Sequence, residues 1–263
     1  MTAGLITNAR GRYYHIDCGP GDLAPYILTC GDPARVRRIA RRFDRVAVRR
    51  RHREFFTITG TYQGVPVSVL ATGIGAAASA IAIVEAAQLV PRATFIRLGT
   101  TGALQSDIAL GDLVITSRAL RDENTTRHYA PARLQARAHP QVLAALTKAA
   151  AALKVPHHVG TTSTTDDFYA GQARVMPGFP TLDPDKVARL SRAGVLNFEM
   201  EMSVYLTLAR VSTFQLRAGG ACQVVVNRIH DTFATPALLR LGERRLIDVG
   251  LLALTILARR NAA

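Results

Sequence analysis

Two arginines stand at the ends of apolar, strand-like runs of the sequence. Arg97 lies within the run Thr94–Leu98 and is followed by Gly-Thr-Thr-Gly, and Arg228 follows the run from 220 to 226. A buried guanidinium is costly unless an anion meets it. Because arginine makes paired hydrogen bonds to phosphate oxygens, and the hydroxyl of Thr100 can add another, Arg97 predicts an anion site. A structural salt bridge is the alternative.

A second candidate anion site is the turn Gly31-Asp32-Pro33, which follows the apolar run Tyr26–Cys30. Glycine lets backbone N–H groups approach an anion, and the start of the following helix favours negative charge. Arg35, one turn into that helix, would fold back over the anion. The alternative is an ordinary strand-to-helix turn, with Asp32 as the N-cap and Pro33 at the first helical position.

Two carboxylates lie close together in the segment Asn197–Met202, at a predicted strand-to-helix junction. One carboxylate can accept hydrogen bonds from two neighbouring sugar hydroxyls. Glu199 and Glu201 cannot both face one point if the chain is extended between them. The alternative is a solvated helix start with acids at its positive end.

A loop after a predicted strand carries an aromatic ring, an amide and a guanidinium. These are Phe168, Gln172 and Arg174. A planar heterocycle with a carbonyl and an N–H would use that set of side chains. The surrounding segment, Tyr169–Pro184, is rich in Gly and Pro and is predicted to be a mobile loop.

The turn Gly73-Ile74-Gly75 fits the glycine pattern of dinucleotide-binding proteins. That class needs an acidic residue about 20 positions later to hold a ribose. The next predicted strand, Thr94–Leu98, has no acidic residue and carries Arg97. Within the dinucleotide-binding class, only an NADP oxidoreductase therefore remains as an alternative. Close backbone packing explains the glycines more simply.

The elements that position these residues alternate between strands, glycine turns and helices. This order is typical of a mainly parallel sheet covered by helices, with ligands at the carboxyl ends of the strands. We expect strands at 26–30, 55–62, 65–71, 94–98, 112–117, 158–162 and 220–226. We expect helices at 34–43, 76–89, 140–153, 184–193, 201–210 and 236–260. No linker divides the chain, which predicts one domain over 1–263.

Composition excludes several classes of protein. The net charge is +14, from 33 Lys and Arg against 19 Asp and Glu, but the arginines are scattered and form no basic tail. A basic nucleic-acid-binding protein is therefore an alternative and not the expectation. The three cysteines have no metal-binding spacing, and no apolar run is long enough to span a bilayer. We expect a cytoplasmic protein with no membrane and no nucleic-acid partner.

Read in order, these motifs resemble the nucleoside phosphorylase superfamily, and most closely its uridine phosphorylases. The resemblance runs from about 15 to 231, most of the chain. The motifs that carry it are Gly31-Asp32-Pro33, Thr72-Gly73-Ile74-Gly75, Arg97-Leu98-Gly99-Thr100-Thr101-Gly102, Phe168-Tyr169 with Gly171-Gln172, and Asn197-Phe198-Glu199-Met200-Glu201.

The resemblance implies a single-domain, three-layer α/β sandwich with a mixed, partly barrel-like central sheet. It implies a pentosyltransferase of nucleoside salvage that converts uridine and phosphate reversibly to uracil and ribose 1-phosphate. Phosphate is a co-substrate, and no other cofactor and no metal is expected. A cation site of some relatives lies near Glu54 and Ile74, but Ala78 replaces a hydroxyl ligand there. Subunits of the family form dimers, commonly assembled as hexamers.

The resemblance also implies a role for each site residue. Arg97, Arg174 and Glu201 are the expected catalytic residues. Phosphate would be bound by Gly31, Arg35, Arg97 and Thr100, with Arg53 from a neighbouring subunit. Ribose would be bound by Thr100, Met200 and Glu201, with His15 from the neighbour. The base would be bound by Gly102, Phe168, Gln172, Arg174 and Arg228.

The substrate class follows from a difference within the superfamily. Relatives acting on purines carry an acid where this chain has Asn227-Arg228. Nucleosidases use water and lack the phosphate arginines, whereas this chain has Arg35, Arg53 and Arg97. Both observations favour phosphorolysis of a pyrimidine nucleoside. A purine nucleoside phosphorylase or a nucleosidase is the alternative within the superfamily.

Overall fold

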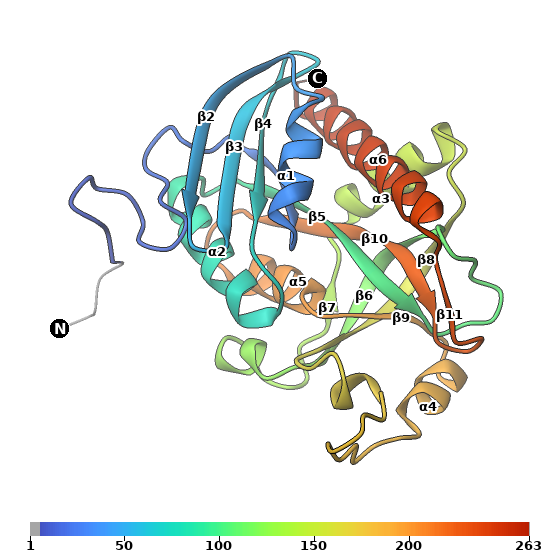
Figure 1. The fold of residues 1–263 in the computed structure, drawn as a ribbon. Helices are drawn as coiled ribbons and strands as arrows, with labels where there is room; N and C mark the ends of the chain where they lie inside the picture. The colour runs from blue at the N-terminus through green and yellow to red at the C-terminus, as the bar shows by residue number, and fades with distance from the viewer. Residues whose placement is uncertain (1–5, 263) are drawn as a thin grey trace.

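All strands among residues 6–262, the part of the chain that the computed structural model describes, join one sheet (Figure 1). Their order is β11-β10-β6-β8-β9-β5-β1-β4-β3-β2, with β7 paired to β6. The strands are β1 (Tyr26–Cys30), β2 (Arg45–His52), β3 (Phe55–Tyr62), β4 (Val65–Ala71), β5 (Thr94–Ala103), β6 (Leu113–Asp122), β7 (Ala136–Arg137), β8 (His157–Thr165), β9 (Val195–Glu199), β10 (Arg217–Asn227) and β11 (Thr232–Phe233).

Helices surround this sheet, and most of them begin at the turns that the sequence marks. They are α1 (Pro33–Ala40), α2 (Ala76–Leu89), α3 (Pro140–Ala152), α4 (Lys186–Arg192), α5 (Met202–Val211) and α6 (Pro236–Ala262). Two short 3₁₀ helices, η1 (Thr125–His128) and η2 (Ala170–Gln172), add single turns. No helix in the described part of the chain combines the length and apolar character needed to cross a membrane.

Strand β5 is the junction between an open and a closed part of the sheet. It runs parallel to β1 over Thr94–Arg97 and parallel to β10 along almost its whole length. Its last two residues, Gly102 and Ala103, pair antiparallel with β9. The strands β5, β10, β6, β8 and β9 therefore close into a small barrel, while β1, β4, β3 and β2 continue as an open sheet. The predicted mixed and partly barrel-like sheet is confirmed.

Two apolar clusters lie on the two faces of the sheet. One joins α1, α3 and α6 to strands through side chains such as Val36, Leu146 and Leu254. The other joins α2 and α5 through Ile83 and Tyr205, among others. Helices thus cover both faces, and the three-layer arrangement is confirmed (Figure 1).

Several elements differ from their predicted bounds. Strand β2 was not predicted, because its apolar residues are confined to 46–48 and arginines, most of them exposed, make up half of this edge strand. Charged side chains suit an exposed edge, since they oppose pairing with another chain. Strand β9 was predicted only as part of a junction. The helix predicted at 184–193 is shorter at both ends, as α4.

Candidate active site

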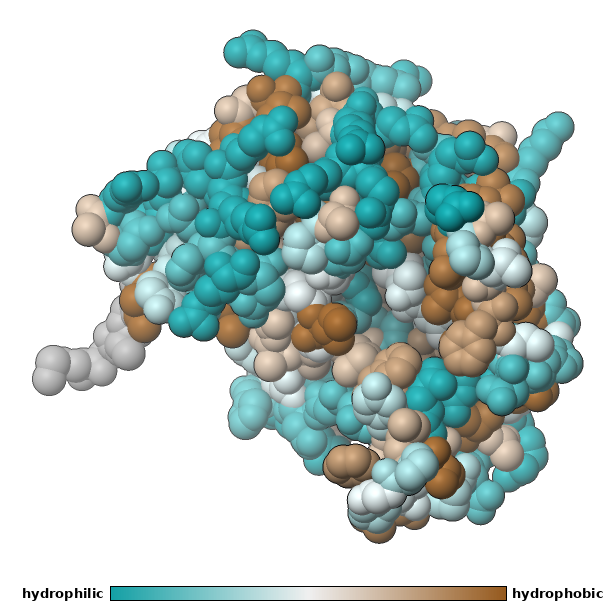
Figure 2. Space-filling model, viewed as in Figure 1, coloured by the Kyte–Doolittle hydropathy of each residue, from teal (hydrophilic) through white to brown (hydrophobic). Residues whose placement is uncertain are grey.

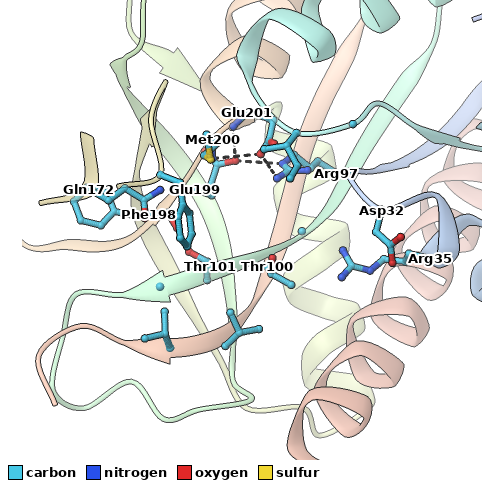
Figure 3. Close-up of a pocket in the computed structure, with 18 of the residues that line it drawn as sticks. Asp32, Arg35, Arg97, Thr100, Thr101, Gln172, Phe198, Glu199, Met200 and Glu201 are labelled. Atoms are coloured by element: carbon cyan, nitrogen blue, oxygen red, sulfur yellow. Dashed lines mark hydrogen bonds and ion pairs between the residues drawn. The ribbon is translucent and has the colours of Figure 1, made fainter. Parts of the chain in front are cut away.

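A cavity of about 830 Å³ opens where the carboxyl ends of β1, β5, β8 and β9 meet. Figure 2 shows the hollow near the middle of one face, and Figure 3 shows the side chains that line it. The ends of these strands deliver the turn at 31–33, the segment 99–102 and the junction 198–201 to one place. The predicted ligand site at the carboxyl ends of the strands therefore coincides with a cavity.

Arg97 forms the buried floor of this cavity. Its Nε lies 3.2 Å from a carboxylate oxygen of Glu199, and its Nη2 donates to Glu201. Burial lowers the pKa of Arg97, but the carboxylates of Glu201 and Glu199 outweigh it and raise that pKa. The third nitrogen, Nη1, is buried and has no hydrogen-bond partner among the described residues. Arg97 thus makes the structural salt bridge and still keeps one donor for an anion.

Two glycines make room for the Arg97 side chain and backbone. A Cβ atom at Gly99 would lie 2.9 Å from Nη2 of Arg97 and 2.8 Å from Sγ of Cys222. A Cβ atom at Gly220, on the neighbouring strand β10, would lie 2.5 Å from the carbonyl oxygen of Arg97. Any larger residue at either position would displace the arginine, so both glycines are part of the site.

The two carboxylates at the β9–α5 junction both reach Arg97. An extended chain would have separated them, but β9 ends at Glu199 and the chain bends before α5. Glu199 is buried and accepts from the backbone N–H groups of Glu201 (2.9 Å) and Met202 (2.8 Å) and from the hydroxyl of Thr164. Burial raises the pKa of Glu199, with Arg97 acting against that rise and Glu201 adding to it.

Glu201 connects the arginine to the glycine turn that precedes α2. Its Oε1 accepts from the backbone N–H of Gly75 at 2.7 Å, while its Oε2 accepts from Arg97. A carboxylate has about four acceptor positions, so Glu201 retains capacity for hydroxyl donors in the cavity that it lines. The glycine turn therefore serves the site by backbone contact.

Three residues predicted to bind phosphate are labelled in Figure 3, Arg97 and Arg35 at the right and Thr100 near the middle. Thr100 is the exposed residue of β5, and it lines the cavity together with Gly31 and Arg35. Arg35 is held by Oε1 of Glu243 (2.7 Å from its Nε) and by the carbonyl oxygen of Leu98 (2.9 Å from its Nη1). Gly31 allows a close approach, since a Cβ atom there would lie 3.1 Å from the carbonyl oxygen of Gly73.

The turn after β1 also behaves as an ordinary helix start. Asp32 caps α1 by accepting from the N–H of Ala34 at 2.7 Å, and Pro33 stands in the first turn. The predicted cap is confirmed, and it coexists with the placement of Arg35 in the cavity. The anion site at this turn stays a prediction.

The opposite end of the cavity carries the predicted base-binding side chains. Cζ of Arg174 lies 4.4 Å from the centroid of the Phe168 ring, and its Nε is buried without a partner among the described residues. Burial lowers the pKa of Arg174, against the opposing charges of Asp231 and Tyr169. Gln172 is buried, lines the cavity and donates to the hydroxyl of Thr165 at 3.3 Å.

Arg228 contacts the backbone at this end of the cavity and does not itself line the cavity. Its Nη1 donates to the backbone carbonyl of Gln172 at 2.9 Å, so it fixes the turn that carries the amide. Burial and the charge of Arg174 lower the pKa of Arg228 to about 10, although Asp231 acts the other way. Gly102 lines the cavity, and a Cβ atom there would lie 3.0 Å from Val226.

His15 and Arg53 lie together on a surface outside the cavity of their own chain. The ring of Tyr14 is 5.0 Å from the ring of His15, and Cζ of Arg53 lies 5.6 Å from the Tyr14 centroid. The two residues assigned to a neighbouring subunit are therefore presented side by side. Their role in another subunit's site stays a prediction.

The sequence did not indicate several apolar residues that line the cavity. They include Ile74, Val225, Val226 and Phe233, whereas Met200, which also lines the cavity, had been assigned to ribose by the resemblance. Val225 and Val226 belong to an apolar strand that looked like core alone. Phe233 lies in the two-residue strand β11, for which no sequence pattern exists.

Comparison with known proteins agrees with the resemblance in the motifs. A family model described as Phosphorylase superfamily matches residues 25–239. The uridine phosphorylase of Thermococcus kodakarensis is 44% identical over 252 residues, covering 94% of this chain and 87% of that protein. The uridine phosphorylase of Escherichia coli is 34% identical over 250 residues, covering 92% of this chain and 96% of that protein. The guanosine phosphorylase of Halorubrum lacusprofundi is 32% identical, covering 82% and 83%. With its fold, its motifs and a family match across most of its length, the chain belongs to the phosphorylase superfamily.

Proposed function

We propose that the protein catalyses the reversible phosphorolysis of uridine to uracil and ribose 1-phosphate. The observation that carries the proposal is Arg97, a buried guanidinium that keeps one unpartnered nitrogen and lines the same cavity as Arg35 and Thr100. A free buried donor beside a second arginine suits a dianionic phosphate. Two of the relatives named above are uridine phosphorylases.

The reaction breaks the bond between C1′ of the ribose and N1 of the base while a phosphate oxygen bonds to C1′. Arg35, Arg97 and Thr100 would hold phosphate at one end of the cavity. Glu201 would accept from the ribose 2′- and 3′-hydroxyls and so fix C1′ against the phosphate, with Met200 beside the sugar. Such positioning accounts for a large share of the barrier in bimolecular reactions.

The electron pair of the broken bond moves onto the base, which then takes up a proton to become uracil. Arg174 and Gln172, which line the cavity, would donate to the oxygens of the leaving pyrimidine, and Phe168 would contact its face. Donors aimed at developing charge usually supply the largest catalytic contribution. The partial positive charge on the ribose is met by the phosphate and by Glu201. We propose that no cofactor besides the co-substrate phosphate takes part.

We propose that two copies share their sites, with His15 and Arg53 of each serving the other. One supporting observation is their joint position on the surface. Another is the outward face of α2, where Ala77, Ile81 and Val84 are at least partly exposed. The one charged residue of α2, Glu85, is buried, and its Oε1 lies 2.6 Å from Nδ1 of His15. An apolar helix face of this kind favours a second copy as its partner, and assembly of dimers into hexamers would follow the family.

A cytoplasmic location is part of the proposal. The described cysteines, Cys18, Cys30 and Cys222, are all free and buried. Unpaired thiols are usual in a reducing compartment.

A purine nucleoside is the second candidate substrate, since one relative is a guanosine phosphorylase. Position 227 speaks against it. The Asn227 side chain donates to the carbonyl oxygens of Gln105 (3.0 Å) and Ile108 (2.9 Å), and it is buried outside the cavity. It therefore offers no acid to a purine nitrogen.

The test follows uracil release from uridine by absorbance, with and without inorganic phosphate. Release only with phosphate supports the proposal, and inosine and guanosine should react at least about a hundredfold more slowly, because a site that hydrogen-bonds one base leaves its polar groups unpaired with another. Release without phosphate would identify a hydrolase. Release from guanosine alone would move the substrate to purines. Inactivity together with tight, salt-dependent binding of DNA or RNA would favour a nucleic-acid-binding protein.

A further inference from the structure

We propose that Glu243, on α6, is a positioning residue that holds Arg35 in the orientation needed to bind phosphate. The inference rests on the proposed function, because it assumes that the Arg35 end of the cavity accepts a phosphate group. Nothing in the sequence motifs points to Glu243, which lies far along the chain from every one of them.

Glu243 fixes Arg35 from the side away from the cavity. Its Oε1 accepts from Nε of Arg35 at 2.7 Å, and the Arg35 side chain is only 9% exposed. Arg35 lines the cavity, whereas Glu243 does not. Figure 3 shows the guanidinium of Arg35 pointing from α1 toward Thr100. The carboxylate therefore acts on phosphate through the arginine.

A second contact completes the orientation of the guanidinium. Nη1 of Arg35 donates to the carbonyl oxygen of Leu98 at 2.9 Å, in the strand that carries Arg97 and Thr100. With Nε held by α6 and Nη1 by β5, the plane of the guanidinium is set, and Nη2 has no protein partner among the described residues. A guanidinium makes paired hydrogen bonds to phosphate only when the orientation of its plane is fixed before phosphate binds.

Glu243 is itself held by a further ion pair. Nη2 of Arg38 donates to Oε1 of Glu243 at 2.9 Å and to Oδ2 of Asp32 at 2.7 Å. Asp32 lines the cavity and would repel a phosphate if it were not paired. The chain Asp32–Arg38–Glu243–Arg35 thus ties α1 to α6 and neutralises an acid beside the anion site.

Charge and geometry predict opposite effects for Glu243. A carboxylate this close to Arg35 opposes phosphate through its charge, so its removal would strengthen binding if charge alone mattered. A positioning role predicts that loss of the 2.7 Å contact weakens binding, whatever the charge. Two conservative variants separate the possibilities.

Glu243→Gln loses the charge but can keep an oxygen at the place of Oε1, with its amide nitrogen then facing Arg38. Glu243→Asp keeps the charge but withdraws the oxygen by one methylene group. The control is Asp248→Asn, because Asp248 pairs α6 with the turn that follows α1, at 3.3 Å from Arg42, and both side chains are exposed. Thermal melting of each variant checks that the fold is unchanged.

The measurements are the KM for phosphate, the KM for uridine and the Kd of inorganic phosphate by calorimetry without nucleoside. We expect Glu243→Asp to raise the KM and Kd for phosphate about tenfold, the scale known for outer partners of ligand-binding side chains. The KM for uridine should change less than twofold. Glu243→Gln should stay within about threefold of the wild type, and Asp248→Asn should be unchanged.

Phosphate binding that is unaltered in Glu243→Asp, or clearly weaker in Glu243→Gln than in Glu243→Asp, would overturn the positioning role. Tighter binding in Glu243→Gln, with Glu243→Asp unchanged, would show that charge alone matters. Failure of the proposed function is distinguishable, because the wild type itself would then neither bind phosphate nor release uracil.

Discussion

The two ends of the cavity are built in different ways. At the phosphate end, Arg97 and Thr100 lie on a central strand, and Arg97 is buried among paired carboxylates. At the base end, Phe168 and Arg174 lie on the segment between β8 and α4, and Phe168 is 46% exposed. The phosphate end is held by strands on both sides of β5. The base end is held by the short 3₁₀ turn η2 and by Arg228.

The difference indicates a division of labour. The phosphate end must place several donors around one anion, which needs groups that are fixed before the anion arrives. The base end must admit and release a planar ring, which suits a segment with few buried contacts. Mutations should therefore separate the two ends: changes at the phosphate end should cost both stability and activity, and changes at the base end should cost activity alone.

The strongest test of this difference is Arg97→Met. The change leaves Glu199 and Glu201 buried without their cation, and breaking a buried pair costs about 3 to 5 kcal/mol. It also removes the free donor, which should lower kcat/KM about a thousandfold. Urea unfolding and uracil release measure the two effects. Arg97→Lys retains charge without the fork, so its losses should be smaller; a fully active Arg97→Met would remove Arg97 from the mechanism.

The second test compares the two carboxylates. Glu201→Gln should lower kcat about a hundredfold, because the weaker acceptor holds the ribose hydroxyls and Arg97 less firmly. Glu199→Gln is the matched control, since Glu199 accepts from Arg97 and from the first turn of α5. We expect the control to cost more in stability, about 1 to 3 kcal/mol, than in ribose binding. Equal effects of both variants on kcat and on the KM for uridine would contradict the separate roles.

Sequence alone predicted much of this arrangement, because the chemistry of the phosphate end is local in sequence. Arg97 and Thr100 are three residues apart on one strand, and Glu199 and Glu201 share one junction. Apolar runs also predicted β1, β3 and β4 with the bounds that the structure shows. Strand β2 was not predicted because arginine makes up half of its residues, so no pattern of apolar residues indicated a buried face.

What the sequence missed depends on contacts between distant elements. Glu243 meets Arg35 only because α6 packs beside α1 on the same face of the sheet. Phe233 reaches the cavity only through the two-residue strand β11. Glu199 and Glu201 face the same arginine because of the bend between β9 and α5, which no residue pattern predicts. Such features follow from tertiary packing and not from local spacing.

The third test addresses the base end. Arg174→Met removes a donor to the leaving base and should lower kcat about ten- to a hundredfold. The free energy of unfolding should change by no more than about 0.5 kcal/mol, because the Arg174 side chain is partly exposed and its described contact is with the Phe168 ring. Steady-state kinetics with uridine and urea unfolding measure both quantities. A stability loss as large as that of Arg97→Met would erase the contrast between the two ends.

The fourth test measures how fast the cysteine thiols react with a reagent, and the enzyme activity should stay nearly unchanged. Burial raises the pKa of Cys30 and of Cys222 to about 12, so both are protonated at pH 8 and closed to reagents. Cys18 is likewise buried, with its pKa raised by burial to about 12. The native protein should therefore not react with a thiol reagent within minutes, whereas unfolded protein should expose all three cysteines.

The matched control for this test is Val175→Cys, at a position that is 75% exposed beside the base end. It should add one thiol that reacts at once, and the reaction should slow when uracil and phosphate hold the segment in place. Rapid reaction of Cys30 or Cys222 in the native protein would mean that the phosphate end opens as readily as the base end. In that case the contrast in mobility would be wrong even if the contrast in stability held, since a buried ion pair can persist in a region that opens only briefly.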